Sequence, residues 1–80
     1  MSKQLRTARH RRFMAVLVEI RIQAGVTQRE LARRLKRAHS YVSRIEKGDR
    51  RLDVPEMIQW CEVVGADPVD VMKRIVRRGG

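Results

Sequence analysis

The segment from His39 to Lys47 carries hydrogen-bonding side chains at the spacing of one helix face. They recur at i, i+1, i+4, i+5 and i+8 as His39, Ser40, Ser43, Arg44 and Lys47. Val42 and Ile45 fall on the opposite side and predict the buried face of the same helix. The polar stripe includes no acid. Short polar groups with one arginine and one lysine suit the major groove of duplex DNA, whose base edges present both acceptors and donors.

A very short link must position that helix. Thr27-Gln28-Arg29-Glu30 reads as a capping box, and we expect a helix from there to about Leu35. Residues 36–38 follow, and the next helix begins near His39. Such a turn between two amphipathic helices imposes a large crossing angle, so the second helix projects from the body of the domain.

The remaining chain predicts three more helices, at about 10–24, 54–64 and 68–76. Asp53-Val54-Pro55-Glu56 and Asp67-Pro68 give start signals, and Gly25, Gly48 and Gly65 fall where helices end. We expect an all-α domain of five short helices. The predicted inward side chains are Phe13, Leu17, Ile20 and Ala24; Leu31, Ala32 and Leu35; Val42 and Ile45; Val54, Met57, Ile58, Cys61 and Val64. The apolar residues of the fifth helix are Val69, Met72, Ile75 and Val76.

Two side chains have open interpretations at this level. Trp60 lies one step from the expected inward face of its helix, so it is either at the edge of the core or in a dimer contact. Glu46 would be repelled by phosphate, so we expect it to pair with Arg21 or Arg50 and to hold its helix in place.

Composition predicts a polyanionic partner, which could be nucleic acid, an acidic membrane surface or an acidic protein. The 80 residues include 19 Lys and Arg against 9 Asp and Glu, a net charge of +10. Residues 1–51 carry 15 basic and 4 acidic side chains, whereas residues 52–80 carry 4 and 5, which places the polyanion-binding surface in the first part. With 42% hydrophobic residues the chain can form a core, so it is not a disordered tail.

The sequence contains few motifs for targeting, metal binding or catalysis. The sequence predicts no membrane-spanning helix, no signal peptide and, with a single cysteine, no internal disulfide, so we expect a cytoplasmic protein. His10, His39 and Cys61 lack metal-ligand spacing. We find no phosphate-binding loop and no nucleophile paired with a base, and therefore predict neither a cofactor nor an enzyme.

Residues 27–48 strongly resemble the helix-turn-helix of XRE/Cro-type regulators, which are related to phage repressors. The motifs T-Q-x-E-L-A and S-Y-V-S-R-I-E-x-G carry the resemblance, and it extends over about residues 12–72. It implies a repressor-like domain over 12–76, between a basic N-terminal arm (1–11) and a frayed basic tail (77–80). In the turn this sequence departs from the common pattern: Lys36 replaces a frequent glycine, and Ala38 replaces a frequent capping serine.

The resemblance also implies functional positions. Base contacts are expected from His39, Ser40, Ser43 and Arg44; phosphate contacts from Gln28, Arg37, Tyr41, Lys47, Arg50 and Arg51. Arg44 could instead contact only phosphate, and His39 could contact phosphate or simply face solvent. Tyr41 alternatively packs across the turn. Arg9, Arg11 and Arg12 in the arm could contact the DNA backbone or remain a solvated extension.

The sequence therefore predicts a double-stranded-DNA-binding transcriptional regulator that forms a homodimer through its C-terminal helices, about residues 63–75. It would read a near-palindromic operator with helix 39–47 in the major groove. The alternative is an antitoxin-type or restriction-controller DNA binder that acts with a partner protein. RNA is disfavoured because the three aromatic residues are scattered, and a membrane surface because no broad apolar face is predicted to be exposed.

Overall fold

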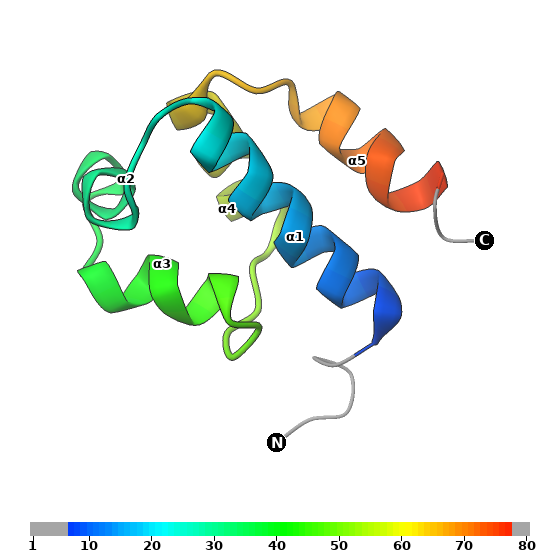
Figure 1. Ribbon diagram of the computed structural model, residues 1–80, viewed down its shortest axis with the longest axis horizontal. Coiled ribbons are helices and arrows are strands. Elements are labelled where there is room, and N and C mark those ends of the chain that lie inside the picture. The colour runs from blue at the N-terminus through cyan, green and yellow to red at the C-terminus, as the bar shows by residue number, and fades with distance from the viewer. Residues whose placement is uncertain (1–6, 78–80) are drawn as a thin grey trace.

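The computed structural model describes residues 7–77 and contains five helices there, with no strand in that part of the chain (Figure 1). They are α1 (Ala8–Gln23), α2 (Gln28–Leu35), α3 (His39–Glu46), α4 (Val54–Val64) and α5 (Pro68–Arg77). The all-α prediction is confirmed.

Side-chain caps explain where four of the helices begin. At the start of α5, the Asp67 carboxylate accepts from the backbone N–H two residues later, at 2.9 Å. The hydroxyl oxygens of Thr7 and Thr27 accept hydrogen bonds from the backbone N–H three residues later. Asp53 and Glu56 form a full capping box, in which each side chain accepts from the other residue's backbone N–H, at 2.8 and 3.0 Å. These bonds satisfy donors that the first turn of a helix would otherwise leave without partners.

The start of α3 lacks these local aids. Lys36, which ends α2, adopts the left-handed conformation at φ 59°, ψ 43°, a region that costs a residue with a side chain about 1–2 kcal/mol. Ala38, the N-cap of α3, makes no side-chain capping bond. Packing must therefore hold α3, and its apolar side is fully buried: Val42 and Ile45 are each 0% exposed.

The five helices pack around one hydrophobic core, and α1 lies at its centre. In Figure 1, α1 crosses the middle of the view with α4 behind it, α5 along one side and the α2–α3 pair on the other, in agreement with the helix contacts. The core consists of Met14, Val16, Leu17, Ile20, Val26, Leu31, Ala32, Leu35, Tyr41, Val42, Ile45, Met57, Trp60, Cys61, Val71 and Ile75.

The predicted inward faces need correction in α1 and α4. Ala24 is exposed at the end of α1. In α4 the helix is rotated relative to our prediction: Val54 and Ile58 are 60% and 37% exposed, whereas Trp60 is 0% exposed and its indole N–H donates to the Leu17 carbonyl. The sequence offers two overlapping apolar stripes on α4, and the fold buries the one that contains the large indole, whose burial gains more free energy.

The helix boundaries also bear on the predicted arm and tail. Residues 8–11, which we assigned to the arm, belong to the first turns of α1, and α5 continues through residue 77. Residues 1–6 and 78–80 lie outside the described residues. Within residues 7–77, the helices are all too short or too polar to cross a bilayer.

Candidate nucleic-acid interface

The outer side of α3 presents the polar stripe that the spacing predicted. His39, Ser40, Arg44 and Lys47 are exposed, and Ser43 is half-buried. The Ser43 hydroxyl donates to the Ser40 carbonyl at 3.2 Å, which leaves the lone pairs of its oxygen available as acceptors. Together these side chains offer donors and acceptors over two turns of one helix.

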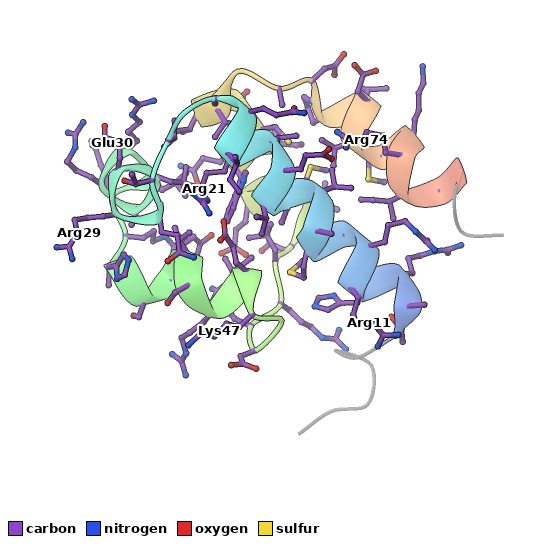
Figure 2. All side chains as sticks on the ribbon, viewed as in Figure 1. Arg11, Arg21, Arg29, Glu30, Lys47 and Arg74 are labelled. Carbon is purple, nitrogen blue, oxygen red and sulfur yellow. The ribbon has the colours of Figure 1, made fainter. Side chains whose placement is uncertain are left out.

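A buried ion pair fixes the inner side of the same helix. Arg21, near the end of α1, donates to the Glu46 carboxylate through Nε at 2.6 Å and through Nη2 at 3.1 Å. The amide of Gln28, the first residue of α2, donates to the same carboxylate at 2.8 Å. Glu46 thus joins three helices. Of its two expected partners, Arg21 and Arg50, the structure contains Arg21, which is labelled in Figure 2.

This arrangement also defines the place of Gln28, a predicted phosphate contact. Its side-chain amide has a second N–H besides the one given to Glu46. The residue is half-buried at the start of α2, so the bond to Glu46 orients the amide rather than hiding it.

A second polar cluster flanks α3 and involves Tyr41, Arg37, Arg50 and Glu56. The guanidinium carbons of Arg37 and Arg50 lie 4.5 and 4.7 Å from the centroid of the Tyr41 ring, within the range of a cation–π interaction. Tyr41 is 8% exposed, so its ring packs beneath the two cations. Burial, and then the nearby Glu56 carboxylate, raise the pKa of the Tyr41 hydroxyl, which keeps it protonated.

Glu56 supplies the negative charge of this cluster. Its carboxylate accepts from both terminal nitrogens of Arg50 at 3.3 Å and from Arg37 at 3.5 Å. The hydrogen bond from the Asp53 backbone lowers the pKa of Glu56, and the Arg50 side chain lowers it further. Sequence reasoning recognised the capping position of Glu56 and missed this role, because Arg37 lies 19 residues away along the chain.

Arg9, Arg11 and Arg12 of the predicted arm all lie on α1. Arg9 and Arg11 are exposed on the first turns of α1, whereas Arg12 donates to the Ile75 carbonyl at 3.4 Å and so ties α1 to α5. The neighbouring His10 faces Arg51; burial, and then that positive charge, lower the pKa of the imidazole. His10 is therefore neutral near pH 7.

A further arginine pair lies on α2. Arg33 and Arg34 both donate to the Glu30 carboxylate, at 2.5–2.9 Å. Side-chain hydrogen bonds from Arg33 first, then Arg34, lower the pKa of Glu30 to about 2. Among residues 7–77, the His, Cys, Asp and Glu side chains form no group of three or more that could hold a metal ion.

A short turn between α2 and α3, a buried apolar side on α3 and a polar outer side together define a helix-turn-helix domain. The family described as "Helix-turn-helix domain" matches residues 1–72 of this chain. The chain belongs to the XRE-type helix-turn-helix family, and its fold is that of DNA-binding transcriptional regulators.

Solved structures support the same assignment. An XRE-family like protein from Pseudomonas syringae pv. tomato str. DC3000 is 38% identical, with a TM-score of 0.88 over 98% of this chain and 95% of that one. The clp gene regulator ClgR from Corynebacterium glutamicum is similar in two structures, at 29% and 28% identity and TM-scores of 0.74 and 0.75. These cover 84% and 88% of this chain and 72% and 92% of ClgR. No curated protein sequence matches significantly.

Proposed function

We propose that this regulator binds a specific double-stranded DNA operator by inserting α3 into the major groove. The observation that carries the proposal is the outer side of α3, where His39, Ser40 and Arg44 are exposed while the acid of the same helix, Glu46, is turned inward to Arg21. A helix of this kind can approach base edges without bringing a negative charge toward the phosphates.

The contacts divide by chemistry. Arg44 can donate two hydrogen bonds to the O6/N7 edge of guanine, the commonest base-specific contact. His39, Ser40 and Ser43 can exchange single hydrogen bonds with neighbouring bases. Phosphate contacts are assigned to Gln28, Arg37, Tyr41, Lys47, Arg50 and Arg51, with Arg9 and Arg11 on α1 as further cations. Tyr41, with its ring buried under two guanidiniums, would act mainly by orienting them.

We further propose that two copies bind together through α5. Val69, Met72 and Val76 form an apolar row on the outer side of this helix, are 58%, 45% and 61% exposed, and line a shallow hollow with Lys73. Apolar side chains in a row at i, i+3 and i+7 suit a second helix of the same kind. A symmetric pair would read two half-sites about one helical turn, roughly 34 Å, apart.

The test begins with selection of binding sequences from a random duplex pool. The selected operator and a scrambled duplex of equal composition are then titrated at physiological salt. We expect an operator affinity at least about 1,000 times higher than the scrambled one, and a near-palindromic selected sequence. Equal affinities would refute specific recognition.

The oligomeric state distinguishes the two kinds of partner that the α5 row could bind: a second copy of this chain or a different protein. Sedimentation of the purified chain should give the mass of a dimer. With operator DNA added, the mass should correspond to two chains per operator. A monomer that instead copurifies with a different protein, and loses it when the α5 row is changed, would favour the antitoxin-type or restriction-controller alternative.

A further inference from the structure

A single carboxylate contacts cations from both flanks of α3. Arg37 precedes α3 and Arg50 follows it, yet both guanidiniums contact Glu56, which comes from α4. Arg37 and Arg50 are 44% and 36% exposed, whereas Glu56 is 15% exposed. The cations therefore face outward and the carboxylate lies behind them.

This geometry lowers the positive charge that the flanks of α3 offer to a polyanion. The cluster holds two cations and one anion, and the Tyr41 ring fixes where the cations lie. A guanidinium that is already paired releases less binding free energy when it meets a phosphate, because it must exchange one anionic partner for another.

We propose that Glu56 is a positioning residue that holds Arg37 and Arg50 as an internal counter-ion and thereby limits binding to DNA of any sequence. The proposal rests on the proposed contact between α3 and duplex DNA. Sequence-independent affinity comes almost entirely from phosphate contacts, whereas Arg44 and its neighbours would supply the base contacts. Restraining two phosphate-binding cations therefore weakens the binding that all duplexes share, and leaves the base contacts unaffected.

The variant Glu56→Gln separates this role from helix capping. A glutamine side-chain oxygen can still accept the Asp53 N–H, as in other capping boxes, but it carries no charge to restrain the arginines. The chain contains a matched control in Glu30→Gln. Glu30, labelled on α2 in Figure 2, occupies the same third position of its helix. It also pairs with two arginines, Arg33 and Arg34.

The experiment measures binding to scrambled duplex DNA between about 50 and 200 mM salt. Each phosphate contact contributes about 0.9 to the slope of log affinity against log salt. We expect Glu56→Gln to steepen the slope by up to about 1.8 and to raise the low-salt affinity for scrambled DNA up to roughly tenfold. An unchanged slope, or an equal change in Glu30→Gln, would overturn the proposal.

A second comparison does not depend on the folding of Glu56→Gln. Lys47 forms no ion pair within residues 7–77, whereas Arg50 is paired. We expect Arg50→Gln to reduce the slope by clearly less than Lys47→Ala does; equal reductions would contradict a restraining role. Both comparisons use scrambled DNA, so they remain informative even if the operator titration shows that the proposed specific recognition is wrong.

Discussion

Arg21 donates to Glu46 at 2.6 Å and so joins the end of α1 to the last turn of α3. The two side chains are only 12% and 6% exposed. Arg21 also donates to the Val26 carbonyl at 2.8 Å, beside the start of α2. One guanidinium therefore holds the beginning of the helix-turn-helix and the helix that would read DNA, which sets the orientation of α3 against the rest of the domain.

Removing the Glu46 carboxylate should leave the buried Arg21 guanidinium without its charged partner. We expect Glu46→Ala to lower the free energy of unfolding by about 3–5 kcal/mol, a large part of what a domain of this size has. Urea denaturation followed by circular dichroism measures it. Glu62→Ala, at an exposed position of α4, is the control; a difference between the two variants of less than about 0.5 kcal/mol would show that the pair contributes little.

The left-handed residue in the turn gives a second stability prediction. Lys36→Gly and Lys36→Ala both remove the cation, but only glycine adopts φ 59° without a side-chain clash. We therefore expect the glycine variant to be more stable than the alanine variant by about 1 kcal/mol. Thermal melting of the two variants measures this difference. Equal melting temperatures would mean that the left-handed conformation at residue 36 costs a side-chain-bearing residue no stability.

The starts of α2 and α4 could be predicted because their signals are local. Thr27 with Glu30, and Asp53 with Glu56, are pairs three residues apart whose hydrogen bonds need no other part of the chain. The burial of α3 was equally local in origin, since Val42 and Ile45 leave only one apolar side.

Tertiary packing decided what local patterns could not. On α4, Ile58 and Trp60 lie on overlapping stripes, and the packing of α4 in the core, where Trp60 donates to the Leu17 carbonyl, determines which of them is covered. Because they too depend on tertiary packing, the partners of Glu56 could not be predicted from the sequence. Its contacts with Arg37 and Arg50 depend on how α4 crosses the α2–α3 turn, and many acid–arginine pairings in so basic a chain would look equally good.

Acid should weaken the α2 cluster in a defined pH range. The pKa of Glu30 is about 2 in the folded chain, against an ordinary 4.5. Because the folded value is the lower one, the contribution of this carboxylate to stability is fully present above pH 4.5 and is lost as the pH falls toward 2. A carboxyl NMR titration should place the midpoint of Glu30 near pH 2. About 1 M salt reduces the Debye screening length to about 3 Å and should therefore raise that midpoint. A midpoint near 4.5 at low salt would contradict the pairing.

The apolar row on α5 should control self-association. Met72→Glu places a charge in the centre of the row, and symmetry would bring two such charges together at the proposed interface. We expect the dimer dissociation constant to rise at least about tenfold, equivalent to about 1.4 kcal/mol, as measured by sedimentation. Ile22→Glu introduces the same charge at an exposed site on α1 and should leave the constant unchanged; equal effects would argue against α5 as the contact.

Arg44 and Lys47 should differ in what they contribute to DNA binding, although both are exposed near the end of α3. Arg44→Ala removes the proposed base contact, so it should lower operator affinity by about 1–3 kcal/mol and make one operator position tolerant of any base pair. Lys47→Ala should instead weaken operator and scrambled DNA alike and reduce the salt slope by about 0.9. Competition with operators changed at single base pairs measures the first effect, and salt titration the second. If Arg44→Ala weakens both duplexes equally, Arg44 contacts phosphate and the base readout must come from His39 and the serines.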